Sequence, residues 1–239
     1  MADALLSLAG VHTRIGRYHI LQGVDLDIEA GAVTALLGRN GAGKTTTMRT
    51  IMGLWRRSEG ALRFAGTDIG ALPTPDIARL GIAYVPENMG LFGSLTVREN
   101  LVLAARAGAM DSARLDWLLG LFPALKKFWH LPAGNLSGGQ KQMLAIGRAV
   151  IEPRKLLLID EPTKGLAPAI VQNLIAALNE LKRTTTILLV EQNFGMATAV
   201  GDRVAVMDDG RIVHRGSMRE LAGDAGLQQR LLGLSLEAH

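Results

Sequence analysis

Residues 38–46 form the stretch Gly38-Arg39-Asn40-Gly41-Ala42-Gly43-Lys44-Thr45-Thr46. It fits the pattern G-x-x-x-x-G-K-[S/T] of a phosphate-binding loop. Residues 33–37 before it are mostly apolar and predict a buried strand, and residues 46–54 after it predict a helix. A glycine-rich turn that binds nothing can match the pattern by chance, but the flanking strand and helix favour a loop that binds phosphate.

The residue types in this loop suit a nucleoside triphosphate with Mg²⁺. Its glycines allow positive φ angles and a close approach to a ligand. Backbone N–H groups of residues 38–46 are expected to face the phosphates, at the positive end of the following helix. Lys44 is expected to contact the β- and γ-phosphates, and the Thr45 hydroxyl is expected to ligate Mg²⁺.

Composition limits the class of protein. The 239 residues suffice for one domain with a subdomain, and 48% of them are hydrophobic. The absence of cysteine excludes disulfides and thiolate metal sites. A net charge of +4 suits a scattered basic surface, nucleic-acid binding or contact with an anionic membrane, and no dense basic run chooses among them.

No stretch reaches the roughly 18 to 20 apolar residues that span a bilayer. The first residues, Met1-Ala2-Asp3-Ala4, carry an acid where a signal peptide carries basic residues. We therefore expect a soluble chain that meets a membrane only through a partner.

The order of elements predicts an α/β protein with a helical insertion. Strands are expected within residues 4–28, 61–65 and 82–85, and again at 155–160 and 186–190. Between them, residues 96–150 show helical patterns and no convincing strand, with a looser stretch at 120–132. Asp208-Asp209-Gly210 predicts a hairpin near the end of the chain.

A second motif is acidic. Asp160 and Glu161 end the apolar run that starts at residue 155. Two solvated acids at a strand end would be the ordinary interpretation, but together with a phosphate loop they suit catalysis. Asp160 is expected to hold Mg²⁺, and Glu161 is expected to polarise a water for attack on the γ-phosphate.

A third motif, Leu136-Ser137-Gly138-Gly139-Gln140, precedes a predicted helix over residues 143–150. Ser137 is a good N-cap, and the glycines expose backbone N–H groups at the helix start, which suits an anion. A capped helix after a flexible turn is the alternative. Because one nucleotide needs a single cradle, a second one suggests that it closes over nucleotide held by another copy.

Together, these three motifs resemble the ATP-binding cassette ATPases of ABC transporters over roughly residues 5 to 230. The resemblance implies an α/β fold with a P-loop (RecA-like) core, an N-terminal antiparallel β subdomain and an inserted helical subdomain. It implies a discontinuous core of residues 1–87 and 151–239, and a helical subdomain of residues 88–150. The segments 84–87, 161–168 and 189–193 are similar to LivF-type subunits of branched-chain amino-acid importers, and urea and short-amide importers have similar subunits.

In this family two cassettes meet head to tail and sandwich two ATP molecules with Mg²⁺. The resemblance implies that Ser137, Gly138, Gly139 and Gln140 contact ATP held by the partner. Glu161 would be the general base. The partners would be a second ATP-binding subunit, identical or paralogous, membrane permease subunits facing residues 88–150, and indirectly a substrate-binding protein. Nucleic acid is not expected. The chain would lie at the cytoplasmic face of the inner membrane.

Three positions depart from the broader cassette pattern. Glu87 stands where Gln is usual, and a carboxylate there can still reach Mg²⁺ or water. Gln192 stands where a switch His is usual, and an amide can bond a γ-phosphate but has no titratable proton near neutral pH. No aromatic stands at the adenine-stacking position. Tyr18, which lies near it, is expected to supply the ring, with an ordinary half-buried loop tyrosine as the alternative.

Other functions remain as alternatives. DNA-repair cassettes carry long heptad-rich coiled coils between the first two motifs, and this interval is short and lacks heptads. Translation-type cassette proteins join two cassettes in one chain. A regulatory module without turnover would not need both Asp160 and Glu161.

Overall fold

The structure is a computed structural model that describes residues 4–105 and 110–233. Its N-terminal part is an antiparallel sheet with strand order β2-β1-β4-β5. From Val24 to Ile28 the apolar side chains are buried and the acidic ones exposed, as their alternation predicts. The strands of this sheet are β1 (Ala4–Ile15), β2 (Tyr18–Glu29), β4 (Arg57–Phe64) and β5 (Thr67–Asp68).

The second sheet has six strands in the order β10-β9-β3-β8-β7-β6 and is parallel except for the hairpin strand β10. Every residue of β3, β7 and β8 is buried, as expected for apolar strands covered on both faces. The strands are β3 (Val33–Leu37), β6 (Ile82–Val85), β7 (Leu156–Asp160), β8 (Thr186–Val190), β9 (Arg203–Asp208) and β10 (Arg211–Ser217).

The carboxyl ends of the three central strands lie side by side. Val190 of β8 pairs with Leu36 of β3 on one side and with Asp160 of β7 on the other. The segments that follow these strands therefore leave the same edge of the sheet, which is where open α/β sheets bind ligands.

Helices outside residues 88–150 pack around the sheets. They are α1 (Lys44–Ile51), α2 (Thr74–Arg79), α7 (Pro168–Leu181), α8 (Phe194–Val200), α9 (Met218–Gly223) and α10 (Ala225–Leu232). Helix α1 begins two residues earlier than the sequence pattern predicts, because Lys44 already belongs to its first turn. In the described part of the chain, no helix has both the length and the apolar composition needed to cross a bilayer.

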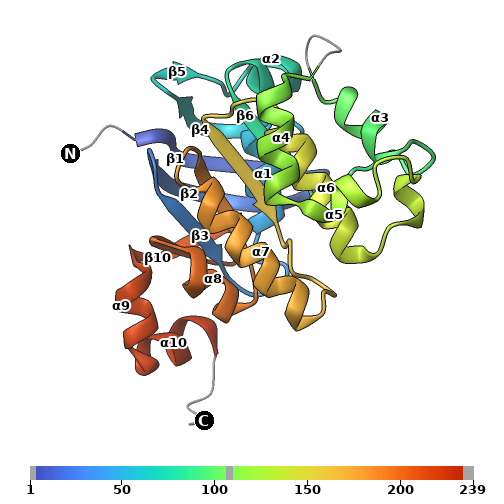
Figure 1. The fold of residues 1–239 in the computed structure, drawn as a ribbon. Coiled ribbons are helices and arrows are strands. Elements are labelled where there is room, and N and C mark those ends of the chain that lie inside the picture. The colour runs from blue at the N-terminus through green and yellow to red at the C-terminus, as the bar shows by residue number, and fades with distance from the viewer. Residues whose placement is uncertain (1–3, 106–109, 234–239) are drawn as a thin grey trace.

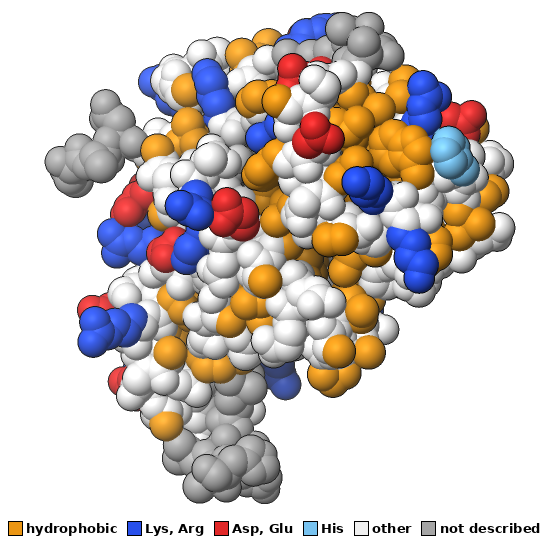
Figure 2. Space-filling model, viewed as in Figure 1, with side chains coloured by type: hydrophobic (Ala, Val, Ile, Leu, Met, Phe, Trp, Pro, Cys, Tyr) orange, Lys and Arg blue, Asp and Glu red, His pale blue; other side chains and the backbone are white. Residues whose placement is uncertain are grey.

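A helical segment lies beside the sheets (Figure 1). Its elements are α3 (Val97–Val102), α4 (Ser112–Leu121), α5 (Pro123–Lys127), the short 3₁₀ helix η1 (Ala133–Asn135) and α6 (Gly138–Val150). The looser stretch 120–132 holds α5, which Pro123 opens, because proline suits the first turn of a helix. On the face shown in Figure 2, apolar side chains gather over this segment.

The two faces of the six-stranded sheet belong to different cores. Leu157 and Ile159 of β7 pack with α7 and the helical segment, whereas Leu156 and Leu158 pack with α1 and the N-terminal sheet. Alternate residues of one strand thus join the helical segment and the N-terminal sheet to a common layer.

Candidate active site

The phosphate loop between β3 and α1 packs tightly against β9. Gly38, Gly41 and Gly43 have φ angles of 147°, 83° and 108°, values that side chains resist. At Gly38 space also forbids a side chain, because a Cβ atom would lie 2.2 Å from the carbonyl oxygen of Met207. The glycines at these positions are therefore required by the shape of the loop itself.

A cavity of about 340 Å³ lies over this loop. Its walls come from β2, the phosphate loop and the loops that follow β6 and β7. They are formed by Ile20, Asn40, Gly41, Gly43, Lys44, Thr45, Thr46, Glu87, Glu161 and Lys164. The structure thus brings together phosphate-loop residues and two acids, Glu87 and Glu161, that lie far along the chain.

Lys44, which is predicted to contact the β- and γ-phosphates, is buried in the phosphate loop. Its ammonium group donates hydrogen bonds to the carbonyl oxygens of Gly38 at 2.8 Å and Arg39 at 3.0 Å. Burial lowers the pKa of Lys44, and the nearby carboxylates of Glu161 and Asp160 partly oppose this shift. Its Nζ atom lies 3.8 Å from Glu161 Oε1, so it faces this carboxylate as well as the loop.

Asp160 accepts a hydrogen bond on each carboxylate oxygen. Thr45 Oγ1 donates to Oδ1 at 3.1 Å, and the Tyr84 hydroxyl donates to Oδ2 at 3.1 Å. Burial raises the pKa of Asp160, and these two hydrogen bonds lower it in part. Thr45 and Asp160 present a hydroxyl and a carboxylate oxygen, the hard ligands that suit Mg²⁺ beside phosphate oxygens, so the residues present fit this ion.

Glu161 lies directly at the cavity in a strained backbone conformation. Its φ angle is 47°, a value that costs a non-glycine residue about 1 to 3 kcal/mol and is often found at functional sites. Gln192 Nε2 donates to Glu161 Oε1 at 2.6 Å and to Asn40 Oδ1 at 2.6 Å. Gln192 therefore connects the predicted base to the phosphate loop.

Glu87 follows β6 and reaches the same cavity. Its Oε1 atom accepts a hydrogen bond from Lys164 Nζ at 2.6 Å, and the same Nζ lies 3.8 Å from Glu161 Oε2. The predicted role of Glu87 at ATP and Mg²⁺ stays a prediction, but its place at the cavity is compatible with that role.

The third motif lies apart from this cavity. Ser137 and Gln140 form a reciprocal capping box at the start of α6. Gly139 is needed for packing, because a Cβ atom there would lie 2.5 Å from Cγ2 of Ile170 in α7. Ser137 and Gly138 are exposed, so they are accessible to another molecule, while the predicted contact with ATP on a partner stays a prediction.

Tyr18 is the first residue of β2, in the hairpin that β1 and β2 form, and is 60% exposed. Arg17 donates a hydrogen bond to its hydroxyl at 3.2 Å. From this hairpin, Ile20 is the residue that lines the phosphate cavity. Stacking of Tyr18 on adenine stays a prediction.

Sequence reasoning assigned no role to Glu191, which the structure places beside the site. Glu191 is buried after β8 and accepts hydrogen bonds from Thr163 N and Oγ1 at 3.1 and 2.7 Å, and from Gln192 N and Asn193 N at 3.1 and 3.2 Å. The sequence did contain a signal for a role of Glu191, because it is an acid directly after a mainly apolar strand. Its partner Thr163 lies 28 residues away, a separation that no local pattern encodes.

Comparisons with known proteins agree with this geometry. A family model described as ABC transporter matches residues 21–164. The chain is 39% identical, over 96% of its length and 100% of the relative, to the high-affinity branched-chain amino acid transport ATP-binding protein BraG of Pseudomonas aeruginosa. It is 36% identical to the probable branched-chain amino acid transport ATP-binding protein LivF of Archaeoglobus fulgidus, over 90% of this chain and 93% of that one.

A solved structure described as the ATP binding subunit of an ABC transporter has the same fold. It superposes with a TM-score of 0.81 at 30% identity, and the match covers 98% of this chain and 96% of the other. The family model spans more than half of the chain, and the similarity to BraG extends over the whole relative. The chain therefore belongs to the ABC transporter family and is one of its ATP-hydrolysing, ATP-binding cassettes.

Proposed function

We propose that this chain is the motor subunit of an importer for branched-chain or other hydrophobic amino acids, in which ATP binding and hydrolysis drive a membrane permease. The functions named for BraG and LivF support this substrate class. One observation carries the hydrolytic part of the proposal: the Glu161 carboxylate lies at the phosphate cavity between Lys44 and Gln192. Import of urea or short amides by the same type of subunit is the alternative.

The proposed reaction divides its tasks among residues of three loops. Lys44 and the N–H groups of residues 38–46 bind the phosphates. Glu161 takes a proton from the attacking water, and Gln192 orients Glu161 through their 2.6 Å hydrogen bond. Mg²⁺, held by Thr45 and Asp160 with Glu87 nearby, would neutralise charge on the β- and γ-phosphates.

We further propose that two cassettes sandwich the nucleotide. Ser137 and Gly138 are exposed at the N-terminus of α6, and the residues that line the phosphate cavity of the same chain do not include them. A helix N-terminus attracts anions, so this one suits the γ-phosphate on a second subunit, identical or paralogous. Residues 1–87 and 151–239 would form the core, and residues 88–150 the helical subdomain.

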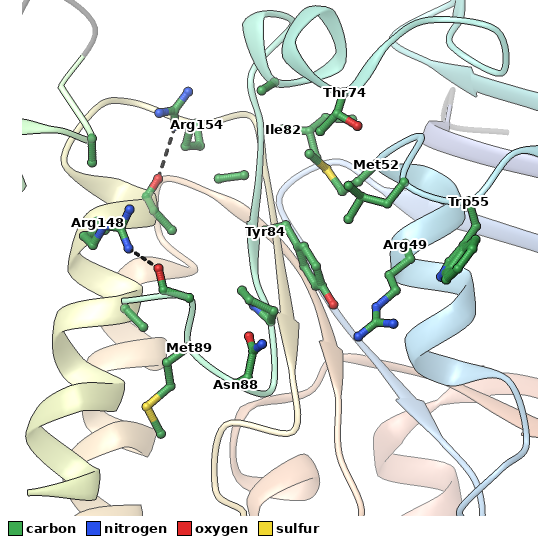
Figure 3. A pocket seen from close by; sticks show the side chains of 18 residues that line it. Arg49, Met52, Trp55, Thr74, Ile82, Tyr84, Asn88, Met89, Arg148 and Arg154 are labelled. Carbon is green, nitrogen blue, oxygen red and sulfur yellow. Dashed lines mark hydrogen bonds between the residues drawn. The ribbon is translucent and has the colours of Figure 1, made fainter. Parts of the chain in front are cut away.

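The permease is proposed to dock in a second cavity, of about 610 Å³, between the sheet and the helical segment. Figure 3 shows Tyr84 on β6 pointing towards Arg49 of α1, with Arg148 of α6 on the opposite wall. Asn88, Met89 and Gly90 line this cavity, and the neighbouring Phe92 is 49% exposed. An open, partly apolar recess of this kind suits a helix of a membrane partner.

The remaining parts of the proposal follow from this assembly. The permease would hold the chain at the cytoplasmic face of the inner membrane. The chain would then interact with a substrate-binding protein only indirectly, through the permease. Nucleic acid has no place in the proposed assembly.

Hydrolysis and transport can be tested separately. Glu161→Gln should retain ATP binding and lose about 10²-fold or more of the turnover rate, whereas Lys44→Ala should weaken ATP binding itself. Wild-type hydrolysis by Glu161→Gln would contradict the assignment of the base.

Substrate class needs a separate test. Uptake of labelled leucine by the reconstituted transporter should be inhibited by unlabelled isoleucine and not by urea, and the reverse result would favour the alternative.

A further inference from the structure

Lys164 lies in a tight turn that begins at Glu161, the proposed base. Its N–H donates to the carbonyl oxygen of Glu161 at 3.3 Å, and Leu166 N donates to Thr163 O at 3.1 Å. The neighbouring Thr163 is buried and hydrogen-bonded to Glu191. The backbone that carries Lys164 is therefore fixed relative to Glu161.

The Lys164 side chain lies between two carboxylates from different loops. Its Nζ atom donates to Glu87 Oε1 at 2.6 Å and lies 3.8 Å from Glu161 Oε2. On the other side of the same carboxylate, Lys44 Nζ lies 3.8 Å from Glu161 Oε1. Lys164 thus joins the loop after β6 to the loop after β7 at the edge of the phosphate cavity.

Repulsion among neighbouring carboxylates explains why Glu87 needs the contact with Lys164. Glu87, Asp160 and Glu161 converge at the site, and the charges of Glu161 and Glu87 both contribute to the raised pKa of Asp160. Carboxylates this close repel one another, and that repulsion favours conformations in which Glu87 turns away. An amide at position 87 would not be repelled, so a carboxylate there needs a countercharge. Lys164 provides it, and Glu87 in turn raises the pKa of Lys164.

The pair is not a source of fold stability. The side chains of Lys164 and Glu87 are 61% and 44% exposed, and exposed ion pairs contribute little to stability. Any effect of removing the Lys164 charge should therefore be seen in the site rather than in unfolding.

We propose that Lys164 is a positioning residue that acts through Glu87: it holds the Glu87 carboxylate over the phosphate cavity and ties the loop after β6 to the loop that carries Glu161. The proposal rests on the proposed function, because it takes Glu87 and Glu161 as parts of the ATP site. It assigns Lys164 no contact with ATP.

The test is a double-mutant cycle on the full chain. Lys164→Met keeps the length of the side chain and removes its charge, Glu87→Gln removes the partner charge, and a third variant carries both changes. Lys164→Met should lower kcat about tenfold and raise KM for ATP several-fold. Glu87→Gln should cost less, because an amide at position 87 is not repelled, and the double variant should match Glu87→Gln alone. Lys164→Arg should restore most of the rate, and Arg183→Met, which breaks an exposed ion pair with Glu180 on α7, should leave it unchanged.

Nucleotide affinity gives a second measurement that does not depend on turnover. Lys164→Met should weaken ATP binding several-fold in the presence of Mg²⁺, have no effect without it, and have no effect in the Glu87→Gln background. Weakening without Mg²⁺ would mean that Lys164 binds phosphate directly, and multiplicative losses in kcat would mean that it acts apart from Glu87. Either result would overturn the proposal, and so would a Lys164→Met variant with wild-type kcat and wild-type ATP affinity.

Failure of the proposed function would look different. If Glu161→Gln hydrolyses ATP at the wild-type rate, the assignment of the base is wrong. Non-additivity between Lys164 and Glu87 would still be measurable in that case, so the two failures can be told apart.

Discussion

At the scale of single residues, Gln192 connects the proposed base, Glu161, to the phosphate loop. One amide nitrogen donates to Glu161, 31 positions away, and to Asn40, 152 positions away. The amide offers both a donor and an acceptor without a titrating proton. Its geometry therefore suits positioning of the Glu161 carboxylate rather than transfer of a proton.

Substitution of Gln192 distinguishes these roles. If Gln192 positions Glu161, Gln192→Ala should lower turnover roughly 10²- to 10³-fold, the usual effect of losing one preorganised donor, and Gln192→His should change it little. If a proton must move here, Gln192→His should instead raise turnover and add a pH dependence near a histidine pKa of about 6.5. The measurement is turnover against pH for the three proteins, and an unimpaired Gln192→Ala would show that Gln192 has no part in hydrolysis.

The buried charge of Asp160 lowers the stability of the fold. Its pKa is raised by burial, so the folded chain binds a proton more tightly than the unfolded chain does. This group therefore favours folding at a pH below its unfolded value, and that contribution is lost as pH rises through the folded value. Without Mg²⁺, the ionised Asp160 costs stability near neutral pH.

Asp160→Asn should relieve that cost. Asparagine keeps an acceptor for Thr45 and can donate to the Tyr84 hydroxyl, so we expect the melting temperature without Mg²⁺ to rise by about 2 to 4 °C at pH 8, for a gain of about 1 kcal/mol. The gain should shrink at acid pH, where protonation of Asp160 increasingly offsets the cost. Asp116→Asn, at an exposed position of α4, is the control. A gain of equal size at both pH values would contradict the explanation by charge.

At the scale of elements, the buried central strands were predictable because their apolar runs are continuous, and the ends of these strands fixed the edge where the site lies. The phosphate loop, Asp160 and Glu161 followed from motifs that are local in sequence. The contacts that hold these motifs together were not predictable. Tyr84 meets Asp160 across 76 positions, and Lys164 meets Glu87 across 77, so each depends on packing between elements.

Glu191 clamps the loop after β7 to the loop after β8. It accepts its hydrogen bonds from three backbone N–H groups and one hydroxyl. A glutamine in its place would point an NH₂ group, which can only donate, at backbone N–H groups, which also only donate. Glu191→Gln should therefore destabilise the chain by about 1 to 3 kcal/mol, despite relieving a buried charge.

Thermal unfolding would show this as a fall in melting temperature of roughly 2 to 4 °C per kcal/mol. Thr163→Val, which removes only the hydroxyl donor, should cost less. A Glu191→Gln protein as stable as wild type would show that the two loops do not depend on this clamp.

At the scale of the whole molecule, the exposed N-terminus of α6 predicts dimerisation on ATP. Glu161→Gln, which is expected to bind ATP without hydrolysing it, should sediment as a dimer with ATP and as a monomer without it. Adding Gly138→Asp places a carboxylate where the partner's γ-phosphate is expected, and the dimer should be lost. Gly223→Asp, at an exposed position near the end of α9, is the matched control. A monomer at high protein concentration with saturating ATP would count against the sandwich.

The cavity in Figure 3 and the adjoining Leu91 and Phe92 predict where the permease attaches, since the Phe92 ring contacts Arg148 of the cavity wall. Leu91→Asp combined with Phe92→Asp should leave the ATPase rate of the free subunit within about twofold, because neither side chain lines the phosphate cavity. The same double variant should fail to co-purify with the permease. Val213→Asp, at an exposed position of β10, should retain the complex. Recovery of an intact transporter with the double variant would place the attachment elsewhere.

Helix α6 runs without interruption for 13 residues, from the motif at Ser137 to the wall where Arg148 donates to the carbonyl oxygen of Gly90. At 1.5 Å per residue it is about 20 Å long, so in the proposed assembly it would act as a lever between the nucleotide of the second subunit at one end and the permease cavity at the other. A tilt of about 10° at one end moves the other by roughly 3 Å over that length. Inserting a single residue would turn the two ends by about 100° relative to each other, and no side-chain substitution could restore their phase.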